Sequence, residues 1–240
     1  MERQDIPLAA LRRLADGWHD PARNGCTFCL PPSAGPPNDI ALDGELAAAI
    51  RESGTGAILF WSAKESQAAL PPFPVETSAA YHGWDTNPLR DLLDKRRTIL
   101  VMLLRLSGYA IGVFESERLA QSKVGSRFVK GRHKKGGSSS GRFARRREEQ
   151  ARELMDKASQ TLQEQMEAYQ GPLDHLLLGG DRLTLLAFEK RCPYLERLES
   201  IRLSRVLNVG RPNLEALRSL PRLIYTSRVI SVGLPAVSQR

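Results

Sequence analysis

Hydrophobic and polar positions follow an irregular pattern over the first third of the chain. Apolar residues recur at helical spacing in residues 6–18, and residues 42–50 have the length and composition of a short helix. Residues 20–37 are rich in Pro, Gly and Asn, which predicts a loop. The short apolar run 57–61 predicts a strand, whereas the proline-rich run 69–75 predicts extended chain.

From residue 89 onward the pattern becomes regular. A short helix is expected at 89–95, and the apolar runs 99–106 and 109–114, separated by Ser107 and Gly108, predict an antiparallel hairpin. A third extended segment follows at 118–129. The long segment 142–170 carries small or apolar residues along one helical face, so it predicts a helix that lies on the sheet.

The remaining segments alternate between strand and helix. Asp181 is expected to cap the helix 182–190, and a short helix is expected at 212–220. Strands are expected at 174–178, 201–207 and 225–232. Strands in front, followed by alternating helix and strand, indicate an α/β fold with a mixed sheet flanked by helices. We expect a small support region over residues 1–88 and the main domain over residues 89–240.

Composition narrows the class of protein. Hydrophobic residues make up 41% and charged residues 26% of the 240 residues, as in a folded globular chain. The longest apolar run, 98–106, is too short to cross a bilayer, and the N-terminus lacks the order of a secretory signal. We therefore expect a cytoplasmic protein without membrane contact, monomeric when free.

Three cysteines do not form a disulfide framework. Cys26 and Cys29 have the spacing of half a zinc site, but a second half is missing from the sequence. Cys192 is remote in the sequence, so a structural metal site would have to be completed by His19 or His82. Free thiols are the preferred interpretation, with neither a metal nor a cofactor.

Positive charge is concentrated around one loop. Residues 118–147 hold 11 Lys or Arg and no Asp or Glu, although the whole chain carries only +8. The loop 136–141, Gly-Gly-Ser-Ser-Ser-Gly, lies within them and lacks apolar residues. A solvated flexible linker is one interpretation, but thirty positions without an acidic residue favour RNA binding through phosphates. The expected RNA-binding residues flank this loop: Lys130, Arg132, Lys134, Lys135, Arg142, Arg145, Arg146 and Arg147.

The run 134–150, Lys-Lys-Gly-Gly-Ser-Ser-Ser-Gly-Arg-Phe-Ala-Arg-Arg-Arg-Glu-Glu-Gln, resembles the peptidyl-tRNA hydrolase domain of the archaeo-eukaryotic class-1 release factors. Among the relatives of these release factors, the run is most similar to the bacterial branch of the proteins that act in ribosome rescue and quality control. The resemblance covers about residues 92–232 and implies an RNase-H-like fold. It also implies a Gly-Gly loop that enters the peptidyl-transferase centre and promotes attack of water on the peptidyl-tRNA ester. The partners it implies are the large ribosomal subunit, rRNA and peptidyl-tRNA.

One residue departs from the family pattern. The family has a Gln after the glycines that orients water, and its place falls here to Ser140. The residues that the resemblance assigns to catalysis are Gly136, Gly137, Ser139 and Ser140. His133, the titratable residue nearest the loop, is interpreted as a surface or RNA-facing group.

Three functions are therefore compared. The first is a ribosome-associated peptidyl-tRNA hydrolase, which makes the chain an enzyme for ester hydrolysis despite the missing Gln. The second is a catalytically silent ribosome or tRNA binder of the same fold. The third comprises an unrelated nucleic-acid-binding protein and an RNA nuclease, of which the nuclease would need clustered carboxylates for metal ions. The aspartates considered for this role are scattered in the sequence and are interpreted as caps and surface groups: Asp91, Asp94, Asp174 and Asp181.

Overall fold

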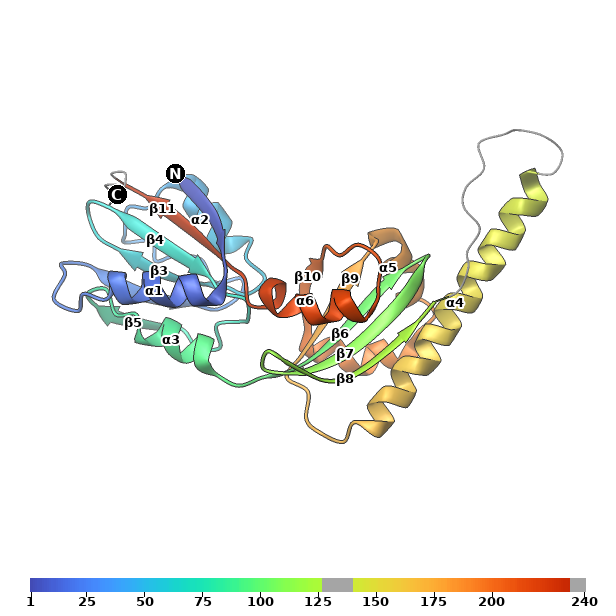
Figure 1. Ribbon diagram of the computed structural model, residues 1–240. Helices are drawn as coiled ribbons and strands as arrows, with labels where there is room; N and C mark the ends of the chain where they lie inside the picture. Colours follow the sequence, from blue (N-terminus) through green and yellow to red (C-terminus); the bar gives the residue numbers. More distant parts are fainter. Residues whose placement is uncertain (127–139, 234–240) are drawn as a thin grey trace. The chain divides into compact units, whose positions relative to one another are not determined.

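The computed structural model describes residues 1–126 and 140–233. The chain divides into two compact units (Figure 1). The first combines Met1–Lys95 with Arg222–Arg240, and the second is Arg96–Pro221. No helix among the described residues has both the length and the apolar character needed to cross a bilayer.

The first unit is built on a six-stranded antiparallel sheet of order β1-β11-β4-β3-β2-β5. Its elements are β1 (Glu2–Ile6), α1 (Leu8–Trp18), β2 (Cys26–Leu30), α2 (Gly44–Arg51), β3 (Ala57–Trp61), β4 (Ser66–Leu70), β5 (Ala79–His82), α3 (Asn87–Asp94) and β11 (Ser227–Val232).

Both faces of this sheet are covered. Phe60 in β3 lies in one core with Leu11 of α1 and Leu89 of α3, whereas its neighbour Leu59 lies in a second core with Leu46 of α2. Successive side chains of a strand point to opposite faces. A continuous apolar run such as 57–61 is therefore what a strand buried on both sides requires.

The expected loop at 20–37 is wrong in its centre, because β2 pairs there with both β3 and β5. The Thr27 hydroxyl donates a hydrogen bond to the Gly83 carbonyl (2.9 Å), which ties the strand to a distant turn. The strand has only five residues between segments rich in Pro, Gly and Asn. Its pairing is long-range, so local composition does not reveal it.

The division into units also differs from the expected boundary between residues 88 and 89. Helix α3 belongs to the first unit, and the final strand, expected in the main domain, crosses back to lie between β1 and β4. The N-terminal region is thus part of a complete layered unit that also contains the end of the chain, and it is larger than expected.

The cysteine pair does not form half a metal site. Cys26 and Cys29 stand three residues apart in β2, so they point to opposite faces of the sheet. Cys29 is buried in the core beneath α1, and Cys192 is buried in the core of the second unit. Within residues 1–126 and 140–233, no three His, Cys, Asp or Glu residues are grouped to hold a metal ion.

The second unit is built on a five-stranded mixed sheet of order β10-β9-β6-β7-β8. Its elements are β6 (Thr98–Arg105), β7 (Gly108–Glu115), β8 (Arg118–Gly125), α4 (Ser140–Ala168), β9 (His175–Gly180), α5 (Arg182–Glu189), the 3₁₀ helix η1 (Pro193–Ile201), β10 (Arg202–Leu207) and most of α6 (Leu214–Ile224).

Strands β6, β7 and β8 are antiparallel neighbours, and β9 and β10 continue the sheet in parallel from β6. The expected α/β fold, with an RNase-H-like mixed sheet flanked by helices, is therefore confirmed. Helices α4, α5 and η1 share one core on one face of this sheet. Helix α6 packs on the other face of the sheet. Its Leu217 side chain lies so close to Gly112 that a Cβ added to Gly112 would be 3.1 Å from Leu217 Cδ2.

Candidate nucleic-acid interface

The second half of α4 is packed firmly against the sheet. Leu154 is the first buried residue among those of the helix whose burial is described, and Ala158 and Leu162 follow on the same face. The spacing of four residues returns each side chain to the same side of a helix, so these residues form the apolar stripe predicted from the sequence.

A buried polar contact fixes the rotation of this half. The Thr161 hydroxyl donates to the Lys157 carbonyl (2.8 Å) and lies 2.8 Å from the Tyr109 hydroxyl in β7. Because the Thr161 proton is already used, the Tyr109 hydroxyl donates to Thr161. No local pattern indicates this contact, since it joins residues 52 positions apart.

Two further contacts hold α4 at its flanks. The Arg191 guanidinium, just beyond α5, binds the Asp156 carboxylate with two hydrogen bonds of 2.9 and 2.8 Å. The Gln121 amide in β8 donates to the Gln165 side-chain oxygen (2.9 Å). The packed half of α4 is thereby held at three points around its circumference.

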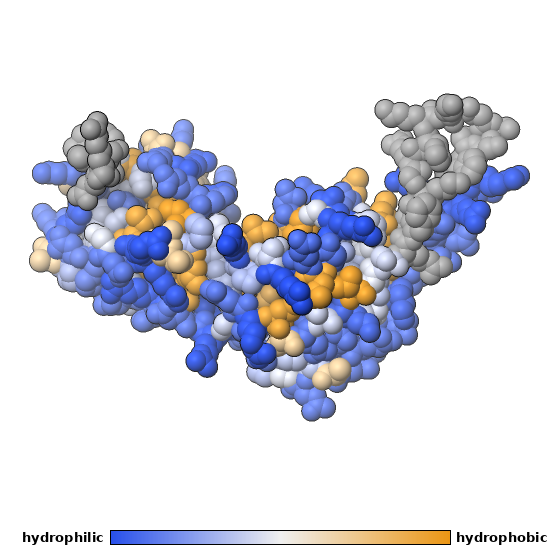
Figure 2. Space-filling model, viewed as in Figure 1, coloured by the Kyte–Doolittle hydropathy of each residue, from blue (hydrophilic) through white to orange (hydrophobic). Residues whose placement is uncertain are grey.

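The first half of α4 projects beyond the sheet (Figure 1). Where burial is described between residues 140 and 153, every side chain is exposed or half-buried. At 1.5 Å per residue these turns carry the start of the helix about 20 Å beyond its first buried residue. The projecting surface is hydrophilic in Figure 2.

Four arginines lie in the first turns of this projecting segment. Arg142, Arg145 and Arg146 are exposed and Arg147 is half-buried. No acidic residue occurs in the first turn, and none of the four makes an ion pair with a described residue. The nearest ion pair on the helix joins Arg152 to Glu148 (3.6 Å), nearer to the packed half.

This arrangement is unfavourable for the isolated protein. The start of a helix carries a partial positive charge, and each cation placed there costs about 0.3–1 kcal/mol at low salt. An anion bound at the same place would reverse the sign, because it meets backbone N–H groups and guanidinium groups together. The geometry therefore fits phosphate groups along an extended nucleic-acid backbone.

The loop that precedes α4 falls outside the described residues. This applies to the following predicted site residues: Lys130, Arg132, Lys134, Lys135, Gly136, Gly137 and Ser139, together with His133. Ser140 is the first residue of α4. Of the predicted site residues, the structure therefore describes only those in α4, which are Ser140 and the four arginines.

The scattered aspartates have structural partners in three of four cases. Asp181 caps α5 by accepting hydrogen bonds from the backbone and the hydroxyl of Thr184, and these bonds lower the pKa of Asp181. Asp174 accepts the Thr98 backbone N–H (2.6 Å), and Asp94 pairs with Arg12 (2.5 Å). The interpretation as caps and surface groups is confirmed for these residues.

Several solved structures match the chain with low sequence identity and low TM-scores. The archaeal translation termination factor aRF1 matches with 18% identity and a TM-score of 0.36, over 91% of this chain and 71% of that protein. Pelota from Archaeoglobus fulgidus matches with 10% identity and a TM-score of 0.31, over 92% and 63%. Pelota from Thermoplasma acidophilum matches with 9% identity and a TM-score of 0.28, over 91% and 62%. No curated protein matches the chain.

Classification rests instead on a family model. The model described as acVLRF1, Actinobacteria/chloroflexi VLRF1 release factor, matches residues 97–230. The match covers more than half of the chain and includes the basic loop and all of α4. It confirms the release-factor resemblance seen in the sequence. The chain therefore belongs to the Actinobacteria/chloroflexi VLRF1 release factor family.

Proposed function

We propose that this chain is a ribosome-associated peptidyl-tRNA hydrolase that frees nascent peptide from tRNA on stalled large subunits. The observation that carries the proposal is the set of four arginines without an ion-pair partner among the described residues, on a projecting helix that begins directly after the Gly-Gly loop. Membership in a release-factor family supports the same role at the ribosome. The chain would act in the cytoplasm as a monomer.

Each part of the site has a role in this proposal. The arginines of α4, with Lys130, Arg132, Lys134 and Lys135, bind phosphates of rRNA and tRNA. Gly136 and Gly137 let the backbone approach the ester closely, because glycine has no Cβ. Ser139 and Ser140 offer hydroxyl and N–H groups to a water molecule and to the developing oxyanion. Water attacks the ester carbonyl, and the products are a free peptide acid and a tRNA with its terminal hydroxyl.

In this proposal the second unit, Arg96–Pro221, which includes α4 and its loop, supplies the hydrolase activity, and the first unit supports it. We assign these roles because the family match begins at residue 97 and leaves most of the first unit uncovered.

A catalytically silent binder is the second candidate, and one observation favours it. Ser140 stands where the family has a Gln, so the longer side chain that orients water is missing. Loss of one preorganised donor costs about 2.7–4 kcal/mol of barrier, or about 10²–10³ in rate. Hydrolysis by this chain should therefore be slower than by a relative that keeps the Gln, unless the Ser140 hydroxyl takes over its role.

The first experiment separates these candidates. Large-subunit complexes carrying labelled peptidyl-tRNA are incubated with the wild type, Gly137→Ala and Ser140→Ala. We expect free peptide and intact tRNA with the wild type, and at least tenfold slower release with Gly137→Ala. Shortened tRNA would show nuclease action instead, and binding without either product would establish the silent binder.

The second experiment tests the arginines. Arg145→Glu/Arg146→Glu should abolish co-sedimentation with large subunits at physiological salt. The matched control is Arg182→Glu/Arg197→Glu, which changes the charge equally at two exposed arginines of the same unit. Equal loss in both variants would show a general charge effect, and unchanged binding of the first variant would remove the arginines from the interface.

A further inference from the structure

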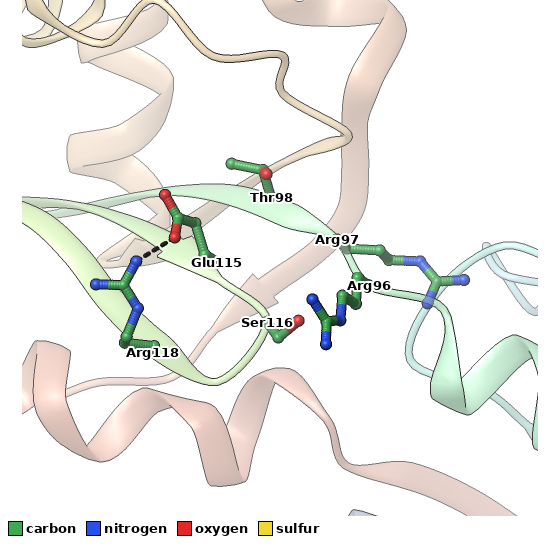
Figure 3. Close-up of a pocket in the computed structure, with 6 residues that line it drawn as sticks. All are labelled: Arg96, Arg97, Thr98, Glu115, Ser116 and Arg118. Carbon is green, nitrogen blue, oxygen red and sulfur yellow. Dashed lines mark hydrogen bonds and ion pairs between the residues drawn. The ribbon is translucent and has the colours of Figure 1, made fainter.

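A second basic site lies at the hairpin between β7 and β8. A hollow of about 520 Å³ opens there (Figure 3). The residues that line it are Arg96, Arg97, Thr98, Glu115, Ser116 and Arg118. Three arginines and one glutamate give this lining a formal charge of +2. Its volume is in the range of small-molecule sites and exceeds what one phosphate group needs.

The hairpin turn holds Ser116 in an unusual conformation. Its φ is +55°, in the left-handed region that residues other than glycine rarely adopt. The Ser116 N–H donates to the Arg97 carbonyl (2.8 Å), which fixes the turn against the start of β6. Figure 3 shows the Arg96 side chain extending toward Ser116, while Arg97, which is buried, points away from it.

The hollow offers donors far in excess of acceptors. Arg96 is exposed and makes no ion pair with a described residue, and the hydroxyls of Ser116 and Thr98 make no hydrogen bond among those residues. Glu115 supplies the carboxylate of the lining, and it is paired with Arg118 (Figure 3). The Asp174 carboxylate near Thr98 already accepts the Thr98 backbone N–H. Such a set of donors is suited to the oxygens of a phosphate.

This hollow lies at the opposite end of β8 from the chain that leads to α4. Arg118 begins β8 and Gly125 ends it. The seven steps between these eight residues, at about 3.3 Å each, separate the two ends by about 23 Å. The hollow is therefore separate from the end of β8 at which the chain continues toward α4.

We propose that this hollow binds a backbone phosphate of an RNA strand, as a second contact of the protein with its RNA partner. The proposal rests on the proposed function for the identity of the partner as RNA. Arg96 and Arg118 provide guanidinium groups, and Ser116 and Thr98 provide hydroxyl donors. Glu115 weakens the site, because its charge opposes a phosphate and occupies Arg118.

The role of Glu115 gives the test two directions. Binding of a fluorescein-labelled single-stranded RNA is measured over a salt series for the wild type, Arg96→Ala and Glu115→Gln. Arg96→Ala should weaken binding about 3-fold to 10-fold and reduce the slope of log K against log salt by about 0.7, the value for one phosphate contact to a single strand. Glu115→Gln should tighten binding, because it removes the opposing charge and frees Arg118.

Each variant has a matched control. Arg182→Ala removes an exposed arginine of the same unit outside the hollow. Glu199→Gln removes the carboxylate of another i,i+3 pair, that with Arg202, which also lies outside the hollow. Ser116→Gly is a further variant that suits the positive φ, so it should fold normally while losing one donor.

The outcomes separate this proposal from the proposed function. Equal slopes for Arg96→Ala and Arg182→Ala, in a protein that releases peptide, would overturn the hollow alone. A lower slope for Arg96→Ala, in a protein that releases no peptide, would support the hollow and overturn the hydrolase. Binding of inorganic phosphate that depends on Arg96, with an unchanged RNA slope, would show a site for a free anion and overturn the RNA contact.

Discussion

The projecting half of α4 should act as a spacer whose length determines where the loop is delivered. The test inserts four helix-forming residues, Ala-Glu-Ala-Lys, between Glu149 and Gln150. Both positions precede Leu154, where the described apolar stripe begins, so the packed half of the helix is not disturbed. The insertion should therefore fold like the wild type, with an unchanged midpoint of urea unfolding.

The displacement follows from helix geometry. Four residues add about 6 Å along the axis and rotate the preceding turns by about 40°. The 13 residues between Ser126 and Ser140 span up to about 45 Å when extended, so the connection to β8 is long enough to follow. A misplacement of about 1 Å at a reacting centre already reduces a rate about 10²-fold. Release of peptide should thus fall at least 10²-fold.

Binding should respond much less than catalysis, because the arginines keep their place relative to the loop. The assay compares single-turnover peptide release with co-sedimentation on large subunits. The control replaces residues 148–151 by the same four residues and so keeps the length of α4. Release by the insertion variant within threefold of this control would refute the spacer role, and equal loss of binding and release would show that the insertion disrupts docking instead.

Three predictions concern the stability of the protein, each measured by urea unfolding. Thr161→Val should lower the free energy of unfolding by about 1–3 kcal/mol, because it leaves the buried Tyr109 hydroxyl unsatisfied. Tyr109→Phe should lower it by only about 1 kcal/mol. A double variant whose loss of stability equals the sum of the two single losses would contradict the hydrogen bond. Gly125→Ala should destabilise by about 1–3 kcal/mol, because a Cβ there would lie 2.3 Å from the Tyr109 ring, while Gly141→Ala, where a Cβ meets nothing, serves as the control. Burial, assisted by the charge of Asp85, raises the pKa of Cys29 to about 11 from 9.0, so the thiol's contribution to stability is complete below pH 9 and lost as pH rises toward 11. Cys29→Ala should remove this part of the pH dependence, and identical curves for both proteins would refute it.

Local pattern was sufficient for most of the second unit. The run 99–106 corresponds to β6 (Thr98–Arg105), and the helix expected at 142–170 corresponds to α4 (Ser140–Ala168). Both are long and strongly periodic, so the apolar residues alone determine their type. The predicted helix cap at Asp181 is also confirmed, because the preference of Asp for the N-terminal cap depends only on neighbouring backbone N–H groups.

The local sequence pattern does not predict which distant strands pair with each other. The strand β2 is short and lies between segments whose composition is typical of loops, so the local pattern does not predict it. The sequence of β11 contains no local feature that assigns it to the first sheet. The hollow at the hairpin was missed for a similar reason. Arg96 and Arg118 are 22 positions apart, and only the pairing of β6, β7 and β8 brings them to one place. By contrast, the arginines of α4 were found because they are adjacent in the sequence.

The position of β11 determines the order in which the protein can fold during its synthesis. All strands of the second sheet have been made once residue 207 is complete, so this unit can fold while the chain is still growing. The first sheet has to wait, because β11 is the strand that joins β1 to β4. Until residue 232 emerges, β4 presents an unpaired edge and β1 lacks its neighbour. The first sheet can therefore be completed only after the whole of the second unit has been synthesised.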